Sequence, residues 1–192
     1  MKRIGITGPT GAGKTTVLKE IEALGGAVID CDAVYHALLE SSAPLRAALT
    51  VRFGPSILDG EGRVNRKALG GVVFGDPAAL ADLNAITHRF ILAEIDRQAA
   101  GAEEQGRSAV AIDAIALIES GLGAPRELRI RRIMAREGIS EDYARKRMEA
   151  QQGDGFFRTH CDYLLENRAD DTPEAFQARA KQLFEQILSN RN

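Results

Sequence analysis

The 192-residue sequence lacks several features that define whole classes of protein. It has no tryptophan and only 5% aromatic residues, so we expect no aromatic platform on which nucleic-acid bases stack. Its formal net charge of −2 gives no electrostatic reason to expect a nucleic-acid partner. It contains no apolar run of about 18 residues and no signal-like start, so we expect a cytoplasmic protein without membrane partners.

Cysteine is also scarce. Cys31 and Cys161 are far apart in sequence and lack the paired spacing of metal ligands. They are therefore interpreted as free thiols in a reducing compartment rather than as a disulfide or a metal site. With 44% hydrophobic residues, the chain can form one globular domain with an inserted subdomain. Nothing in the composition indicates an oligomer, so a monomer is the default expectation.

A glycine-rich loop, "GPTGAGKT" at residues 8–15, follows a short apolar run at residues 3–7. It fits the pattern G-x-x-x-x-G-K-[ST], in which glycines let successive backbone N–H groups turn toward a phosphate. Lys14 is expected to reach the β- and γ-phosphates, and the Thr15 hydroxyl to bind Mg²⁺. The pattern predicts a bound nucleoside triphosphate, most simply ATP. The predicted nucleotide-binding residues of this loop are Thr10, Gly11, Ala12, Gly13, Lys14, Thr15 and Thr16.

The pattern of apolar residues predicts a parallel α/β fold. The order strand, glycine loop, helix, strand within about thirty residues is that of a βαβ unit. The predicted strands are 3–7, 27–30, 108–115 and 163–167. The predicted helices include 15–24, one that begins at Asp76-Pro77, and a closing helix at 172–188. The predicted organisation is a nucleotide-binding core of residues 1–34, 106–125 and 160–192, a mainly helical acceptor-binding subdomain of residues 35–105, and a lid of residues 126–159.

Three aspartates follow predicted strands: Asp30, Asp32 and Asp113. Ligands gather at the carboxyl ends of parallel strands, so all three are expected to face the glycine loop. Asp32 is the preferred candidate for the base that takes a proton from an acceptor hydroxyl. The alternative, that such an aspartate only caps the next helix, stays open for Asp30 and Asp32.

Arginine is concentrated after residue 126. Arg129, Arg132 and Arg136 recur at helical spacing, and Arg145 and Arg147 follow. Such a run is commonly a solvated helix face. In a protein that binds a triphosphate, a lid that closes arginines onto the phosphates is the more specific interpretation.

These segments together resemble the dephospho-coenzyme A kinases, which are P-loop small-molecule kinases. "IGITGPTGAGKTT", "GGAVIDCD", "FGPSILDGEGRVNRKAL", "LNAITH", "AIDAIALIESGL", the arginine-rich stretch and "CDYLLEN" match the family in collinear order. The resemblance implies a three-layer α/β/α fold with a five-stranded parallel sheet. It also implies transfer of the ATP γ-phosphate to the ribose 3′-hydroxyl of dephospho-CoA.

The resemblance also implies residue roles. Lys14, Asp32 and Arg132 would be catalytic, with Asp32 as the base, and Arg136 would contact the nucleotide. The acceptor side would be lined by Asp32, Arg66, His88, Asp113 and Glu119. For His88, a purely structural role remains an alternative.

This chain departs from the family pattern in several places. Ile115 and Arg89 replace prolines, and Asn65 replaces an aspartate. Only Gly123 stands where the family has an apolar strand before its lid. Because loss of a central strand would leave two neighbours unpaired, we infer that about a dozen residues are missing near Gly123–Ala124. Adjacent Cα atoms about 3.8 Å apart there would contradict this inference.

Two rival functions share part of this pattern. Another small-molecule kinase, of the nucleoside, shikimate or gluconate type, would have the same loop and lid. A regulatory GTPase is suggested by "NRAD" at 167–170, which resembles the guanine-reading N-K-x-D. Arg168 replaces the lysine of that motif, however, and D-x-x-G occurs only at 59–62, in a predicted turn.

Overall fold

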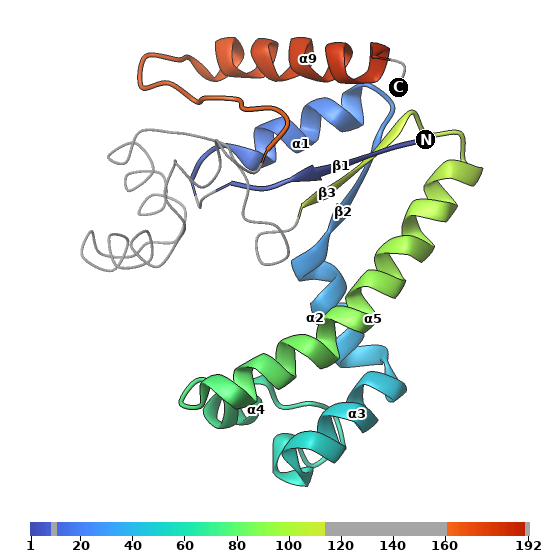
Figure 1. Ribbon diagram of the computed structural model, residues 1–192, viewed down its shortest axis with the longest axis vertical. Coiled ribbons are helices and arrows are strands. Elements are labelled where there is room, and N and C mark those ends of the chain that lie inside the picture. Colours follow the sequence, from blue (N-terminus) through green and yellow to red (C-terminus); the bar gives the residue numbers. More distant parts are fainter. Residues whose placement is uncertain (9–10, 114–160, 191–192) are drawn as a thin grey trace. The chain divides into compact units, whose positions relative to one another are not determined.

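The computed structural model describes residues 1–8, 11–113 and 161–190 (Figure 1). The chain divides into two compact units. Unit 1 consists of Met1–Ile29 and Gly101–Asn192, and unit 2 of Asp30–Ala100. The boundaries fall inside the strand Ala27–Asp30 and near the end of the helix Pro77–Glu104.

Unit 1 contains a parallel sheet. Strands β1 (Lys2–Ile6), β2 (Ala27–Asp30) and β3 (Ala109–Asp113) lie in the order β1-β3-β2. β1 and β3 run parallel, with Lys2 opposite Ala109 and Ile6 opposite Asp113. Ala109, Val110 and Ala111 are buried, as expected for the continuous apolar run of a central strand. The sequence therefore predicted the location of these three strands correctly.

Helices α1 (Lys14–Ala23) and α9 (Pro173–Ser189) lie side by side over one face of this sheet (Figure 1). Phe176, Ala180 and Phe184 recur every four residues along α9, which gives it one apolar face. The buried cluster combines that face with apolar residues of α1, the sheet and the glycine loop: Ile6, Ala12, Val17, Ile21, Ala111, Phe176, Ala180 and Phe184. The Thr172 hydroxyl caps α9 by accepting from the Ala175 N–H at 3.2 Å, as the sequence predicted.

The predicted strand at 163–167 is wrong. These residues are described, and they form no strand. A segment becomes a strand only when a neighbouring strand pairs with its backbone. The neighbour that the family resemblance implies would stand at the place where this chain has only Gly123, which lies outside the described residues. Leu165 packs against the core of unit 1, whereas Tyr163 and Leu164 are exposed.

Unit 2 is helical, as predicted. Its elements are α2 (Cys31–Ser41), α3 (Ala43–Phe53), the 3-10 helix η1 (Pro55–Ile57), α4 (Arg66–Val73) and α5 (Pro77–Glu104), the last of which extends into unit 1. Short polar side chains begin these helices. The carboxylate of Asp76 accepts from the Ala78 and Ala79 N–H groups at 2.9 and 3.3 Å, which confirms the predicted start of α5.

The core of unit 2 is separate from that of unit 1. Its buried residues come from every helix of the unit: Leu39, Leu45, Leu49, Phe53, Ile57, Leu69, Val73, Ala79 and Leu83. Leu45, Leu49 and Ile57 are completely buried, and each such side chain contributes about 1.5–3 kcal/mol through removal from water. In the described parts of the chain, no helix is both long and apolar enough to span a membrane.

Candidate active site

The glycine loop lies between β1 and α1, as the motif requires. Gly11 and Gly13 have φ angles of +80° and +106°, which side chains disfavour. Gly13 is the N-cap residue of α1, so the positive end of this helix begins directly behind the loop. A helix N-terminus approached by glycines is a site where anions bind. Thr10, one of the predicted nucleotide-binding residues, lies outside the described residues.

Gly13 is also required by its surroundings. A Cβ atom on this residue would lie 2.6 Å from Asn167 Nδ2 and 2.8 Å from Phe176 Cε1. Both distances are shorter than van der Waals contact allows. Only glycine therefore fits here, because of the backbone angle and because a C-terminal segment packs directly against the loop.

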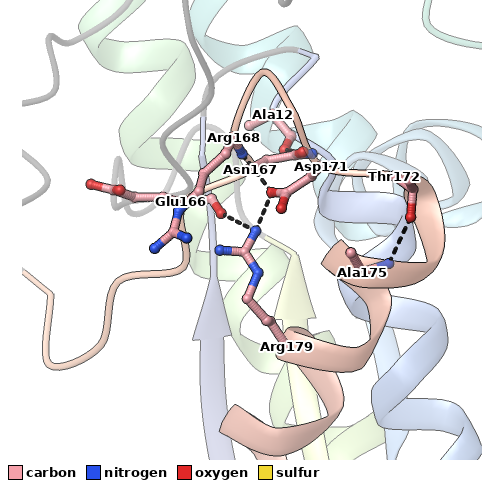
Figure 2. Close-up of polar contacts among 8 residues, drawn as sticks. All are labelled: Ala12, Glu166, Asn167, Arg168, Asp171, Thr172, Ala175 and Arg179. Atoms are coloured by element: carbon pink, nitrogen blue, oxygen red, sulfur yellow. Dashed lines mark hydrogen bonds and ion pairs between the residues drawn. The ribbon is translucent and has the colours of Figure 1, made fainter.

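Asn167 holds the loop through a buried hydrogen bond. Its side-chain Nδ2 donates to the backbone carbonyl of Ala12 at 2.9 Å (Figure 2). Asn167 is 2% exposed and Ala12 is 1% exposed. The sequence indicates Asn167 only as part of the "NRAD" and "CDYLLEN" segments and does not predict this contact. No local pattern signals it, because 155 positions separate the two residues.

The segment that carries Asn167 is held by an ion pair. Arg179 of α9 pairs with Asp171 and donates to the backbone carbonyl of Glu166 at 2.8 Å (Figure 2). Asp171 also accepts from the backbone N–H of Arg168 at 2.7 Å. We call Glu166, Asp171 and Arg179 the clasp. It fixes the backbone on both sides of Asn167.

Lys14 is the first residue of α1, and its Nζ donates to the Gly8 carbonyl at 2.8 Å. This hydrogen bond joins the last part of the loop motif, Lys14, to its first residue, Gly8. Thr15 is exposed in the first turn of α1, and Thr16 donates its backbone N–H to the Gly13 carbonyl at 3.0 Å.

Thr15 fits a role as a magnesium ligand. Mg²⁺ typically binds one or two protein oxygens together with substrate phosphates and water, and an exposed hydroxyl at a helix start offers such an oxygen. In the part of the chain that the structure describes, no three His, Cys, Asp or Glu side chains gather as a metal site. A cation held between Thr15 and phosphates needs no such cluster.

The three aspartates differ in their local roles. Asp113 ends β3 opposite Ile6, the last residue of β1, so it lies at the sheet edge from which the glycine loop departs. Asp30 caps α2 by accepting from the backbone N–H groups of Asp32 and Ala33 at 2.9 and 3.0 Å. The capping alternative is therefore correct for Asp30. Asp32 is not the cap residue; it is exposed in the first turn of α2.

Besides Asp32, two predicted acceptor-binding residues lie in unit 2. Arg66 is exposed at the first position of α4, and His88 is half-buried on α5. Burial raises the pKa of the Tyr35 hydroxyl, and the positive charge of Arg66 acts in the opposite direction. Arg66 and Tyr35 are thus near each other within this unit.

Asn65 explains one departure from the family pattern. Its side chain caps α4 by accepting from the Lys67 and Ala68 N–H groups at 3.0 and 3.1 Å. Asparagine and aspartate cap helices about equally well. The replacement therefore preserves the start of α4 and the position of Arg66 on it.

Several predictions lie outside the described residues. They are Glu119, Ile115, Arg132, Arg136, the lid at 126–159 and the junction Gly123–Ala124. Their positions stay predictions.

A parallel sheet whose first strand leads through G-x-x-x-x-G-K-T into a helix defines a P-loop nucleotide-binding protein. Comparison with known proteins gives the particular family. The family model for dephospho-CoA kinase matches residues 2–172, and the chain belongs to this family. It is therefore a member of a kinase family that uses ATP, and a regulatory GTPase is excluded.

Curated relatives match over nearly their whole length. A dephospho-CoA kinase from Dehalococcoides mccartyi is 34% identical over 197 positions, which cover 96% of this chain and 99% of the relative. One from Corynebacterium glutamicum is 34% identical over 202 positions, covering all of both chains. The second match has ten more positions than this chain's 192 residues, so at least ten positions are gaps here.

Solved structures agree with the fold. A Thermus thermophilus protein of known crystal structure has a TM-score of 0.79 and 27% identity, with 98% of each chain covered. A dephospho-CoA kinase from Campylobacter jejuni has a TM-score of 0.57 and 24% identity, covering 96% of this chain and 97% of its own. The second likeness supports the fold alone.

Proposed function

We propose that the glycine loop and Asp32 have separate roles in phosphoryl transfer in this chain. The glycine loop and Lys14 hold the phosphates of ATP, and Asp32 takes the proton of the acceptor hydroxyl. The reaction is that of the family: ATP-dependent phosphorylation of dephospho-CoA, which gives coenzyme A. The observation that carries the proposal is a complete phosphate-binding loop in a chain that matches this family over residues 2–172.

In the proposed transfer, the ribose 3′-hydroxyl loses its proton to Asp32 while its oxygen attacks the γ-phosphorus. The bond from the γ-phosphorus to the β,γ-bridging oxygen breaks, and ADP leaves. Lys14 and Arg132 offset the negative charge of the transferring group. Arg136 contacts the nucleotide. Mg²⁺, when bound, would neutralise phosphate charge, and the Thr15 hydroxyl would be its ligand.

The acceptor is proposed to bind against Asp32, Arg66, His88, Asp113 and Glu119. Support comes from the position of Asp32, Arg66 and His88 within one compact helical unit. The exposed guanidinium of Arg66 is suited to bind the diphosphate of dephospho-CoA, because a guanidinium group can donate two parallel hydrogen bonds to phosphate oxygens.

We further propose the division of labour predicted from the sequence. Residues 1–34, 106–125 and 160–192 bind the nucleotide, 35–105 bind the acceptor, and 126–159 form the lid. The protein is proposed to be a cytoplasmic monomer that acts only on small molecules.

The reaction can be tested by coupling ADP release to NADH oxidation. Dephospho-CoA should support turnover, whereas adenosine, shikimate and gluconate should not. Turnover with one of these three but none with dephospho-CoA would refute the proposed acceptor and favour another small-molecule kinase.

The role of Asp32 can be tested with a matched pair of variants. Asp32→Asn should leave ATP affinity unchanged and lower turnover by about 10²-fold or more. Asp30→Asn removes the same charge two residues away but keeps the cap of α2, since asparagine caps as well as aspartate. It should retain most of the turnover. Equal losses in both variants would show that net charge matters at this position and that Asp32 is not the base.

A further inference from the structure

The contact between Asn167 and Ala12 constrains a part of the glycine loop, whose backbone N–H groups are expected to face a phosphate. Nδ2 of Asn167 donates to the Ala12 carbonyl at 2.9 Å, and both residues are buried. The peptide bond that follows this carbonyl carries the N–H of Gly13. The chain has no cis peptide bonds among its described residues, so the Ala12–Gly13 bond is trans.

In a trans peptide unit, the C=O and the N–H point in opposite directions and lie in one plane. Anchoring the Ala12 carbonyl on Asn167 therefore turns the Gly13 N–H away from Asn167. Gly13 has φ +106°, and glycine at this angle has other backbone conformations within easy reach. Without the anchor, rotation of this peptide would cost little, because nothing intrinsic to glycine favours one orientation.

Asn167 is itself held firmly. The clasp fixes the backbone at Glu166 and Asp171. The guanidinium of Arg179 lies 6.0 Å from the centroid of the Phe176 ring, which packs against Gly13. On the same turn of α9, Gln177 donates to the buried carboxylate of Glu20 on α1 at 2.6 Å. The anchor is thus connected to the helix that follows the loop.

We propose that Asn167 is a positioning residue that orients the Ala12–Gly13 peptide so that the Gly13 N–H faces the nucleotide's phosphates. This inference rests on the proposed binding of ATP in the glycine loop. It also gives Asn167 a role different from the guanine reading that "NRAD" suggests, because its amide NH₂ group is used by the loop carbonyl.

The test uses the isosteric variant Asn167→Asp. When ionised, its carboxylate cannot donate to the Ala12 carbonyl; when protonated, it can donate through O–H. The dissociation constant of ATP, measured by titration calorimetry, should rise about tenfold or more at pH 8. The ratio of variant to unmodified dissociation constants should then fall toward one as the pH is lowered to about 5.5, because burial at this position raises the pKa of an introduced carboxyl group well above its ordinary value of about 3.9.

Two further variants control for stability. Thr172→Ala removes the cap of the same helix, α9, without touching Ala12. It should lower the melting temperature and leave the ATP dissociation constant unchanged. Asn167→Ala places no charge in the core and serves if the aspartate variant does not fold. It should weaken ATP binding to a degree that does not vary with pH.

The outcomes separate this inference from the proposed function. ATP binding by Asn167→Asp equal to that of the unmodified chain at every pH would overturn the inference, as would a loss that does not vary with pH. In the nucleotide-free protein, the ¹⁵N–¹H resonance of Gly13 should shift in both Asn167 variants and stay in place in Thr172→Ala. An unchanged Gly13 resonance overturns the positioning role whether or not ATP binds. Failure of the unmodified chain to bind ATP refutes the proposed function, while the resonance still decides the orientation of the peptide.

Discussion

Gly13→Ala should be among the most damaging single-methyl substitutions in this protein. The added Cβ would lie 2.6 Å from Asn167 Nδ2 and 2.8 Å from Phe176 Cε1. The backbone angle of +106° costs a residue with a side chain about 1–2 kcal/mol. Displacing the packed neighbours adds about 1–3 kcal/mol, the range for overpacked cores. The expected loss of unfolding free energy is therefore about 2–5 kcal/mol, a large part of an ordinary domain's stability.

Gly106→Ala is the matched control. Gly106 also has a positive φ, +72°, and also belongs to unit 1, but a Cβ there would meet nothing within 4 Å. This variant should lose only the backbone part, about 1–2 kcal/mol. Urea unfolding followed by circular dichroism measures both losses, and the difference between them isolates the contact with Asn167 and Phe176.

The two variants should also differ in nucleotide binding. Gly13→Ala displaces Asn167 from the Ala12 carbonyl and should weaken ATP binding, whereas Gly106→Ala should not. If the two variants lost the same stability, the close approach of residues 167 and 176 to the loop would be refuted. If Gly13→Ala kept full ATP affinity, the link between that approach and the nucleotide site would be refuted.

Three further predictions concern unit 2. Asn65→Asp should keep the acceptor KM and an unfolding free energy within about 0.5 kcal/mol of the unmodified protein, because aspartate can replace the cap of α4. Asn65→Ala removes the cap and should lower the unfolding free energy by about 1 kcal/mol, measured by thermal unfolding. Arg66→Ala should raise the pKa of Tyr35 further, since it removes the positive charge that favours the phenolate. An ultraviolet titration of the tyrosine measures this change, and an unchanged pKa would show that the Arg66 charge does not act on Tyr35. The pKa of Glu94 is lowered from 4.5 to about 2, chiefly by hydrogen bonds from Arg97. The resulting stabilisation is small because Arg97 is exposed; it is present above pH 4.5 and is lost as the pH falls toward 2. In Arg97→Ala, an NMR titration should find the pKa of Glu94 closer to 4.5, and no movement would contradict the pairing.

Local chemistry made much of the fold predictable. The strand at 27–30, the helix that starts after Asp76 and the cap at Thr172 depend on residues within a few positions of one another. The same is true of the loop at 8–15. The strand predicted at 163–167 failed because strand formation depends on a partner elsewhere in the chain. A run of apolar residues does not show what it pairs with, and here only Leu165 packs against the core while Tyr163 and Leu164 are exposed.

The candidate site was predictable only where its residues follow a motif. Lys14 and Thr15 are identified by spacing, and Asp113 by its place at the end of a strand. The capping role of Asp30 required the structure, because only its hydrogen bonds distinguish the cap of α2 from the residues after it. Asn167 was not predictable as part of the loop, because its partner lies 155 positions earlier.

The two units differ in how their candidate site residues are supported. In unit 2, residues next to them in sequence suffice: Asn65 starts the helix that carries Arg66, and Asp30 starts the helix that carries Asp32. In unit 1, the glycine loop at the N-terminus takes its shape from the segment around Asn167 and from α9. Because a loop rich in glycine loses much conformational entropy on folding, it needs support from outside itself. We therefore expect nucleotide binding to depend on α9, even though α9 carries none of the phosphate-binding motif.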